Sequence, residues 1–418
     1  MLRNKQNLAL NLMEQGKNVF LTGDGGTGKT YIINEFKKYC DSTGIDYIVC
    51  APTGIAALQV NGVTIHRVFR LPPRPLVEPV NSLPMTLKDI DVLIIEEISM
   101  VRIDLFDYIA KSVTILNNMR RRKGQNDLQV IVVGDFFQLP PVITNKDRKI
   151  LEQFKYGEEL GKGYAFQSEY WDSFGFIPVM LDEIVRQTDV EFIENLNKVR
   201  RGDMTGLRYF NKNSKKAEIE KAILLCGTNK AVNEKNNIEY NKLNTPEKVY
   251  TATITGEVKD SDKMVPDELK LKIGCRIITV VTDSGGRYYN GTLGTVSFIR
   301  KDSVDIITDD GVKATISPYT WSINNYKAEQ TNQKVKVSIE AIGSFTQLPL
   351  KLAYAATIHK SQGQTFDKVN LDPYCWDCGQ LYVALSRVRT IDGLHLTQLI
   401  QPRYLVTSRD VKQFYLNL

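Results

Sequence analysis

The sequence predicts an α/β fold that is built as two lobes in tandem. Short runs rich in β-branched residues alternate with helix-like patterns, which is typical of a mostly parallel sheet covered by helices. In the first part of the chain these runs are Val19–Thr22, Tyr47–Cys50, Val92–Ile95 and Val130–Val133. A second set contains Val179–Leu181, Ile223–Cys226, Lys351–Ala356, Val369–Leu371 and Leu394–Thr397. The length of 418 residues, which suggests roughly two to four domains, agrees with two separate cores.

Two segments interrupt this alternation, and each predicts an insertion. Residues 70–84 contain five prolines, which fit neither a regular helix nor a central strand, so a stiff insertion is expected at about residues 67–88 of the first lobe. Residues 285–345 combine short strand-like runs with glycine-containing turns, which predicts a small β-barrel. The first lobe is therefore expected at residues 1–178, and the second at residues 179–284 and 346–418.

The composition is that of a globular protein, with 42% hydrophobic and 24% charged residues. No stretch approaches the roughly 20 apolar residues that span a bilayer, and the first residues lack the apolar core and cleavage site of a signal peptide. A cytoplasmic, nucleoid-associated location without membrane contact is expected. The net charge of +6 is compatible with a nucleic-acid partner. Six cysteines in so long a chain do not indicate a disulfide framework, and no second pair of zinc ligands stands near Cys375 and Cys378.

The strongest motif is a phosphate-binding loop. Its sequence is Gly23-Asp24-Gly25-Gly26-Thr27-Gly28-Lys29-Thr30, which matches the pattern G-x-x-x-x-G-K-[ST] in full. A strand-like run precedes the loop and a helical pattern follows it, as the motif requires. The glycines allow backbone N–H groups to wrap a triphosphate at a helix N-terminus. Lys29 is expected to reach the outer phosphates, and the Thr30 hydroxyl to bind Mg²⁺.

Two adjacent carboxylates follow the apolar run Val92–Ile95. Neighbouring residues on a strand point to opposite sides, so Glu96 is assigned to the Mg²⁺ shell and Glu97 to the attacking water. Another apolar run leads into a polar loop, in which Asp135 and Gln138 are candidates to lie near the γ-phosphate. These features together predict ATP and Mg²⁺ as cofactors.

Further motifs follow in a fixed order along the chain. They are Ala51-Pro52-Thr53-Gly54-Ile55-Ala56-Ala57 with Thr64-Ile65-His66, Glu97-Ile98-Ser99-Met100, Gly134-Asp135-Phe136-Phe137-Gln138-Leu139-Pro140-Pro141, Leu181-Asp182-Glu183-Ile184-Val185-Arg186-Gln187, Ala355-Ala356-Thr357-Ile358-His359-Lys360-Ser361-Gln362-Gly363 and Leu381-Tyr382-Val383-Ala384-Leu385-Ser386-Arg387-Val388-Arg389. In order and spacing this set resembles the motifs of the Pif-type (petite integration frequency), RecD-like group of superfamily 1 helicases. The segment Asp104-Leu105-Phe106-Asp107 is similar to that family's own signature region. The resemblance covers nearly the whole chain.

This resemblance implies two RecA-like P-loop lobes, with a proline-rich wedge in the first and an SH3-like β-barrel in the second. It implies an ATP-dependent DNA helicase that translocates from 5′ to 3′ on single-stranded DNA and unwinds duplex or structured DNA at junctions. Two lobes that share one nucleotide are expected to close around ATP and to open after hydrolysis, which would drive stepping. A monomer is expected. The family suggests DNA repair, DNA recombination, telomere maintenance and G-quadruplex unwinding as pathways.

The resemblance also implies roles for residues outside the phosphate-binding loop. Arg186 and Arg387 occupy the places of two arginines that contact the triphosphate, where a cation stabilises charge on the γ-phosphoryl group. Gln6 is in the position of an adenine-reading glutamine, and Gly363, in the fifth motif, is also assigned to the nucleotide site. DNA contacts are expected from Thr53, Gly54, His66, Thr357 and His359.

The chain departs from the family at Glu96, where the family generally has Asp. The longer side chain moves the carboxylate outward, which Mg²⁺ bound through water can tolerate but which could also slow turnover. Three alternatives stay open: a P-loop phosphotransferase, a non-catalytic module that binds nucleotide and nucleic acid, and a translocase or RNA helicase without strong DNA unwinding. Stimulation of ATP hydrolysis by single-stranded DNA would separate a helicase from the phosphotransferase.

Overall fold

The computed structural model describes residues 3–72, 74–77, 83–182, 189–331 and 334–418. The chain divides into two compact units, neither of which is continuous in sequence. Unit 1 contains Met1–Arg186, Asn324–Glu340 and Ser408–Leu418, and unit 2 contains Gln187–Ile323 and Ala341–Thr407.

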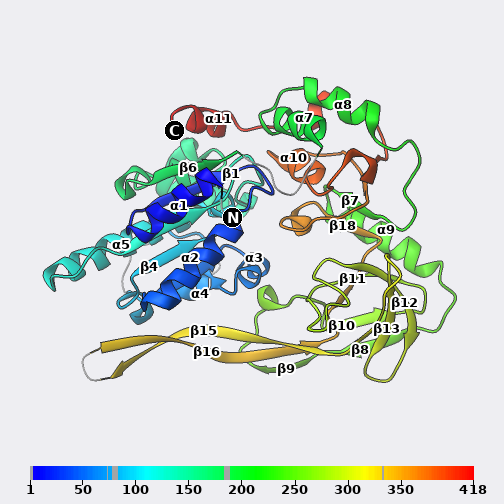
Figure 1. Cartoon of the computed structure of the whole chain (residues 1–418), viewed down its shortest axis with the longest axis horizontal. Coiled ribbons are helices and arrows are strands. Elements are labelled where there is room, and N and C mark those ends of the chain that lie inside the picture. The colour runs from blue at the N-terminus through cyan, green and yellow to red at the C-terminus, as the bar shows by residue number, and fades with distance from the viewer. Residues whose placement is uncertain (1–2, 73, 78–82, 183–188, 332–333) are drawn as a thin grey trace. The chain divides into compact units, whose positions relative to one another are not determined.

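A six-stranded sheet forms the centre of unit 1 (Figure 1). Its order is β3-β2-β4-β5-β1-β6, and all neighbouring strands are parallel. The strands are β1 (Val19–Gly23), β2 (Tyr47–Ala51), β3 (Val63–Thr64), β4 (Val92–Ile95), β5 (Gln129–Val133) and β6 (Ile177–Leu181). The helices are α1 (Asn4–Glu14), α2 (Lys29–Thr43), α3 (Gly54–Gln59), α4 (Ile65–Val68), α5 (Ile103–Arg122), α6 (Asn145–Leu151) and α11 (Arg409–Leu416).

Both faces of this sheet are buried. Leu93 and Ile95 of β4 belong to one hydrophobic cluster, whereas Val92 and Ile94 of the same strand belong to another. Successive side chains of a strand point to opposite faces, so an unbroken apolar run is what a doubly covered parallel strand requires. The apolar runs of the sequence therefore correspond to the central strands.

The helix α11 packs into the core of unit 1. The ring of Phe414 stacks on that of Phe166 with centroids 4.3 Å apart, and it lies 6.0 Å from the ring of Phe20 on β1. This placement differs from the predicted division, in which residues 346–418 all belonged to the second lobe. Ser408–Leu418 group with unit 1 instead, because the apolar side of α11 completes an aromatic cluster there.

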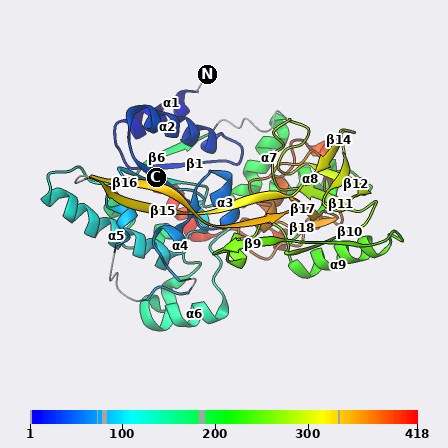
Figure 2. The ribbon, with the colours of Figure 1, turned by 90° about the horizontal axis from the view of Figure 1, so that it is seen from below.

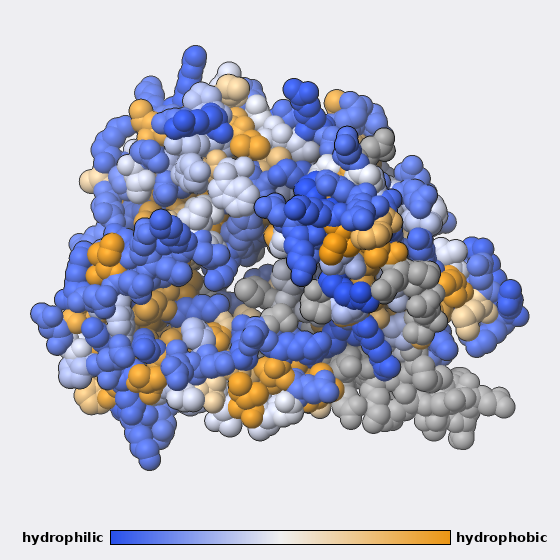
Figure 3. Space-filling view, turned by 180° about the vertical axis from the view of Figure 1, so that it is seen from behind, coloured by the Kyte–Doolittle hydropathy of each residue, from blue (hydrophilic) through white to orange (hydrophobic). Residues whose placement is uncertain are grey.

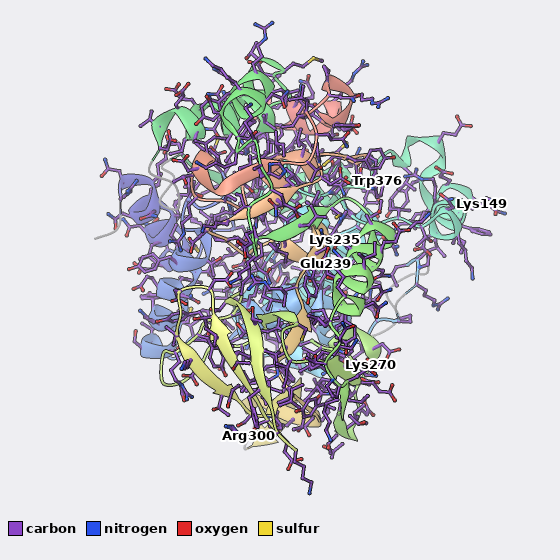
Figure 4. The ribbon with its side chains drawn as sticks, turned by 90° about the vertical axis from the view of Figure 1, so that its right-hand side faces the viewer. Lys149, Lys235, Glu239, Lys270, Arg300 and Trp376 are labelled. Carbon is purple, nitrogen blue, oxygen red and sulfur yellow. The ribbon has the colours of Figure 1, made fainter. Side chains whose placement is uncertain are left out.

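Unit 2 contains a smaller parallel sheet with the order β18-β7-β19-β20. Its strands are β7 (Ile223–Cys226), β18 (Ala355–Thr357), β19 (Val369–Leu371) and β20 (Leu394–Leu396). The helices of unit 2 are α7 (Val190–Arg200), α8 (Thr205–Asn213), α9 (Asn229–Asn241) and α10 (Gln380–Leu385). On α9, the side chains of Lys235 and Glu239 form an ion pair of 3.2 Å one turn apart (Figure 4).

A five-stranded antiparallel sheet, ordered β14-β13-β12-β11-β17, has its own core in unit 2. Its strands are β11 (Arg276–Thr279), β12 (Leu293–Ile299), β13 (Val304–Thr308), β14 (Lys313–Ile316) and β17 (Leu350–Leu352). The sheet extends beyond the predicted barrel, residues 285–345, at both ends. β11 and β17 pair with each other there without the glycine turns on which that prediction depended.

Two long strands, β15 (Tyr319–Thr331) and β16 (Lys334–Gln347), run side by side as a ribbon (Figure 2). β16 also pairs antiparallel with β9 (Thr253–Gly256). A two-stranded sheet of β8 (Lys248–Thr251) and β10 (Glu268–Leu271) completes the β-structure.

The described part of the proline-rich segment is anchored to unit 1. The backbone N–H of Leu76 donates to Oδ2 of Asp104 at 2.8 Å, and the guanidinium of Arg102 donates to both oxygens of the same carboxylate. Asp104 is completely buried, and the side chains of Leu71 and Leu76 pack in the main core of unit 1. Residues 73 and 78–82 of the predicted insertion lie outside the described residues.

The surface shown in Figure 3 is mainly hydrophilic, with hydrophobic residues in small groups. None of the helices in the described ranges is both long enough and apolar enough to cross a bilayer.

Candidate nucleotide and nucleic-acid sites

The phosphate-binding loop joins β1 directly to α2. Gly23 ends β1 with φ of 139°, and a Cβ at this position would lie 2.3 Å from the carbonyl oxygen of Leu181 on β6. Gly28 precedes α2 with φ of 88°, a left-handed conformation that disfavours other residues. The glycine pattern is therefore required by the backbone path, which brings the loop to the N-terminus of a 15-residue helix.

The ammonium group of Lys29 lies across the loop. Its Nζ donates to the carbonyl oxygens of Gly23 at 2.8 Å and Asp24 at 3.0 Å. Thr27 is buried and closes the loop from within, since its Oγ1 donates to the same Asp24 carbonyl at 2.9 Å. Thr30 is exposed in the first turn of α2. The loop thus presents a cation and a hydroxyl at the end of the helix where a phosphate is favoured.

Gln6 of α1 touches this loop. Its Nε2 donates to the carbonyl oxygen of Thr27 at 3.2 Å, and its Oε1 accepts from the backbone N–H of Arg3 at 3.0 Å. The side chain is largely buried. The structure therefore brings Gln6 to the P-loop, and the contact with the base that the family resemblance implied stays a prediction.

Glu96 follows β4 and is the most perturbed acid of the site. Its side chain is buried, and Oε1 has no hydrogen-bond partner among the described residues. Burial, followed by the charge of Glu97, raises the pKa of Glu96 from 4.5 to about 8, while Lys29 acts in the opposite direction. A buried carboxylate oxygen without a donor is costly, and an oxygen-seeking cation such as Mg²⁺ would satisfy it. The site therefore fits the predicted metal.

Glu97 has a strained backbone. Its φ of 51° places a non-glycine residue in the left-handed region between β4 and the short helix η2 (Ile98–Met100). Such a conformation costs on the order of 1–3 kcal/mol and persists mainly where the surroundings impose it. The turn leaves Glu97 partly exposed while Glu96 is buried. The two carboxylates therefore occupy different environments, as separate roles require.

The loop after β5 packs against this turn. A Cβ at Gly134 would lie 3.0 Å from the backbone nitrogen of Ile98. Asp135 is completely buried, and its Oδ1 accepts from the backbone N–H of Phe137 at 3.1 Å. Asp135 therefore orders its own loop, a role that the sequence did not reveal. Gln138 lies in the same loop, and its backbone N–H donates to the Asp135 carbonyl at 2.9 Å.

A tyrosine of α11 joins this loop to the strand that precedes the P-loop. The hydroxyl of Tyr415 lies 2.6 Å from Oγ1 of Thr22 and 3.4 Å from Oδ1 of Asp135, and it accepts from the backbone N–H of Phe136 at 3.3 Å. Its ring stacks on Phe137 with centroids 4.8 Å apart. Sequence reasoning missed this residue, and the only available signal was the apolar face of the helix.

The two predicted DNA-contacting threonines have the same local geometry. Thr53 follows β2, and its Oγ1 accepts from the backbone N–H of Ala56 at 3.2 Å, with Gly54 as the first residue of α3. Thr357 ends β18, and its Oγ1 accepts from the backbone N–H of Lys360 at 3.2 Å. Each threonine therefore caps a short helical turn at the carboxyl end of a parallel strand.

The two predicted DNA-contacting histidines are both partly buried. His66 lies on α4, and its carbonyl accepts from the backbone N–H of Leu71, which ties this helix to the proline-rich segment. His359 begins the short helix η8 (His359–Ser361). Burial lowers the pKa of His359, while Asp377 opposes this shift, so the ring is neutral at pH 7. It can therefore donate one hydrogen bond without being a permanent cation.

Arg387 is held inside unit 2. It is buried, and its guanidinium donates to the carbonyl oxygens of Val383, Ser361 and Gln364 and to the Ser386 hydroxyl, at 2.6–3.1 Å. These contacts join the fifth and sixth motifs. Gly363 is exposed between them, with φ of 78°. Arg186, the other predicted phosphate-contacting arginine, lies outside the described residues.

The fold and these sites define a P-loop nucleotide-binding protein with two α/β units. The family model described as PIF1-like helicase matches residues 1–208. The ATP-dependent DNA helicase Pif1 of Campylobacter jejuni subsp. jejuni is 34% identical, over 91% of this chain and 88% of that protein. The chain belongs to the PIF1-like helicase family, which confirms the resemblance seen in the motifs.

Solved structures agree with this assignment. The crystal structure of Bacteroides sp. Pif1 in complex with ADP-AlF4 has a TM-score of 0.84 and 32% identity, covering 100% of this chain and 97% of that chain. The Bacteroides Pif1 helicase in complex with ADP-AlF3 and single-stranded DNA has a TM-score of 0.69 and 33% identity, with the same coverage. The predicted fold class, two RecA-like lobes with insertions, is thereby confirmed.

Proposed function

We propose that this chain is an ATP-dependent DNA helicase that translocates from 5′ to 3′ along single-stranded DNA and unwinds duplex or structured DNA. The observation that carries the proposal is the nucleotide site of unit 1, in which Lys29 and the buried Glu96 lie beside a complete P-loop. Relatives of this chain are named DNA helicases, and one was crystallised with both a nucleotide and single-stranded DNA. Single-stranded DNA and duplex junctions are the proposed partners of a monomer that works at the nucleoid.

In this proposal Lys29 binds the outer phosphates, and Glu97 orients the attacking water. Thr30 and Glu96 would hold Mg²⁺, which neutralises charge on the triphosphate. Gln138 would respond to the γ-phosphate from a loop whose shape Asp135 maintains.

Four further residues have proposed nucleotide contacts. Gln6 would contact the base, since it already touches the P-loop. Arg186 and Arg387 would stabilise charge on the γ-phosphoryl group, and Gly363 would approach the nucleotide through its backbone. Because the Arg387 guanidinium is bonded to carbonyl oxygens, its contact with a phosphate requires a change in the loop around Ser361 and Gln364.

DNA would be held by one set of residues in each unit. Thr53, Gly54 and His66 form the set in unit 1, and Thr357 and His359 form the set in unit 2. Hydroxyl groups and backbone N–H groups at the start of helical turns are common phosphate contacts, which carry no sequence preference. A motor that moves along any strand needs contacts of this kind.

A strand-displacement assay tests the proposal. Duplexes with a 5′ single-stranded DNA tail, a 3′ tail or an RNA tail are incubated with protein, ATP and Mg²⁺, with the Lys29→Ala variant as the inactive control. Displacement from the 5′-tailed duplex alone is expected. Displacement only from the 3′-tailed duplex would refute the polarity. ATP hydrolysis that DNA stimulates, without any strand displacement, would instead favour a translocase. ATP hydrolysis that DNA does not stimulate would favour a phosphotransferase.

A further inference from the structure

An aromatic side chain is exposed in the loop between β19 and α10. Trp376, labelled in Figure 4, is 54% exposed. The other two tryptophans of the chain, Trp171 and Trp321, are 6% and 5% exposed. Large aromatic side chains are usually well buried, so an indole ring that is half open to solvent requires an explanation.

Trp376 is exposed but firmly positioned. Its indole Nε1 donates to the carbonyl oxygen of Gly227 at 3.2 Å, and its backbone N–H donates to Oε1 of Gln380 at 3.0 Å. Gln380 is completely buried, and its Nε2 donates to the same Gly227 carbonyl. Both N–H groups of Trp376 therefore have a hydrogen-bond acceptor within the protein. A rigid aromatic ring loses little conformational entropy when a ligand stacks on it.

These hydrogen bonds place Trp376 near Thr357 and His359, the proposed DNA contacts of unit 2. Gly227 directly follows Cys226, which is the strand partner of Thr357 and whose carbonyl accepts from the backbone N–H of Ile358 at 3.0 Å. β7, β18 and β19 are parallel neighbours, so the loops at their carboxyl ends share one edge of the sheet. The neighbour of Trp376, Asp377, is near enough to His359 to act electrostatically on it.

We propose that Trp376 is a base-stacking platform for single-stranded DNA, next to the phosphate contacts of Thr357 and His359. The proposal rests on the proposed DNA-helicase function, because it requires that this edge of the sheet meets the strand. Stacking on an aromatic ring accepts every base, since each has a π-face, and it complements contacts that hold phosphates. The exposed Lys360 adds positive charge at the same edge.

Tryptophan fluorescence gives a direct test on the full chain. An oligonucleotide of deoxythymidine is titrated into the protein, and stacking on Trp376 should quench its emission. The Trp376→Phe variant should bind DNA without this quenching, because the two remaining tryptophans are buried. A Trp171→Phe/Trp321→Phe variant, which retains Trp376 as its only tryptophan, should keep the quenching.

Affinity provides the second readout. The Trp376→Ala variant should bind the deoxythymidine oligonucleotide roughly 5- to 150-fold more weakly, the range expected for one stacked base. An abasic oligonucleotide of the same length keeps the phosphates but offers no base, so wild type and Trp376→Ala should bind it equally. The neighbouring Tyr374→Ala variant is the matched control, since Tyr374 is 47% exposed in the same loop.

The outcomes distinguish the stacking role of Trp376 from the proposed DNA-helicase function. Equal affinity of wild type and Trp376→Ala for the deoxythymidine oligonucleotide, or quenching that persists in Trp376→Phe, would overturn the platform while leaving the helicase proposal intact. Failure of the wild-type protein to bind either oligonucleotide would overturn both. A loss of affinity in Trp376→Ala that is equal for abasic and normal strands would show a structural role instead of stacking.

Discussion

One local structure occurs in both units, at the end of one strand of each parallel sheet. In unit 1 the Thr53 hydroxyl accepts from the backbone N–H three residues later, and in unit 2 the Thr357 hydroxyl does the same at the same distance of 3.2 Å. The loops beside these threonines differ. Unit 1 has a glycine-rich loop that opens a long helix, whereas the corresponding edge of unit 2 has a loop held by the buried Gln380.

The same threonine cap therefore occurs beside a phosphate-binding loop in unit 1 and without one in unit 2. A phosphate cradle needs glycines whose backbone bends toward the ligand and an acid that is buried beside the cradle, and only unit 1 combines Gly28 with Glu96. The corresponding edge of unit 2 has Thr357, the neutral His359 and the exposed ring of Trp376. We therefore expect ATP hydrolysis to depend first on the residues of unit 1.

The largest effect is expected from Lys29→Ala. Loss of the ammonium group that lies across the P-loop should reduce ATP hydrolysis to background, because the loop then lacks its own cation for the outer phosphates. Binding of single-stranded DNA should persist, since Thr53 and Thr357, the proposed DNA contacts, are unchanged. Steady-state ATP hydrolysis and fluorescence anisotropy measure the two properties. Lys38→Ala, which removes an exposed lysine of the same helix, is the control. DNA-stimulated hydrolysis by Lys29→Ala would show that the P-loop is not part of the active site.

Arg387→Ala tests whether unit 2 takes part in the chemistry. A cation at the γ-phosphoryl group is worth roughly 10³–10⁵ in rate, so kcat should fall steeply while ATP binding is retained. Because Arg387 is buried among carbonyl oxygens, circular dichroism must confirm that the variant is folded. Arg389→Ala, which removes a largely exposed arginine two residues away, should have a near-normal rate. A folded Arg387→Ala protein with normal kcat would confine the chemistry to unit 1.

The buried acid of unit 1 predicts a dependence of stability on pH. The pKa of Glu96 is about 8 in the folded chain against an ordinary value of 4.5, so the folded state binds this proton more tightly. The contribution of this proton to the free energy of unfolding is complete below the ordinary pKa of 4.5, and it is lost as the pH rises through the folded pKa. Without nucleotide or metal, the Tm should therefore fall between about pH 4.5 and about pH 8. Calorimetry on Glu96→Gln, which stays neutral, should show a smaller fall, and identical profiles would contradict the shift.

The smallest effect is expected at the anchor of the proline-rich segment. Asp104→Asn keeps the shape of the side chain but weakens its bonds to Arg102 and to the backbone of Leu76. If the segment helps to part the strands, duplex unwinding per ATP should fall a few-fold while single-strand-stimulated hydrolysis stays unchanged. Asp127→Asn, at an exposed ion pair, is the control.

Replacing residues 72–79 with a Gly/Ser linker should have the same effect more strongly, because the fixed φ angles of the prolines are then lost as well. Unchanged unwinding in both variants would place the wedge elsewhere, with the inserted β-barrel as the next candidate.

The sequence was most informative where structure depends on neighbouring residues. The P-loop combines a strand, a turn and a helix start within a few positions, and Glu96 and Glu97 directly follow an apolar strand. Contacts between distant residues carried no such signal. The amide of Gln6 meets Thr27 through the packing of α1, and the positive φ of Glu97 is imposed by the surrounding turn. The burial of Asp135 depends equally on the residues that pack around its loop.

The position of α11 has a consequence for how the protein is made. A ribosome completes the six strands of unit 1 early, but Phe414 and Tyr415 emerge only after the whole of unit 2. The bond between Thr22 and Tyr415 joins residues 393 positions apart, and such long closures are slow to form. During synthesis the aromatic cluster around Phe20 therefore lacks the rings of Phe414 and Tyr415, and an interrupted chain would expose apolar surface that chaperones and proteases can recognise. The core of unit 1 can therefore be completed only after the residues of unit 2 have been synthesised.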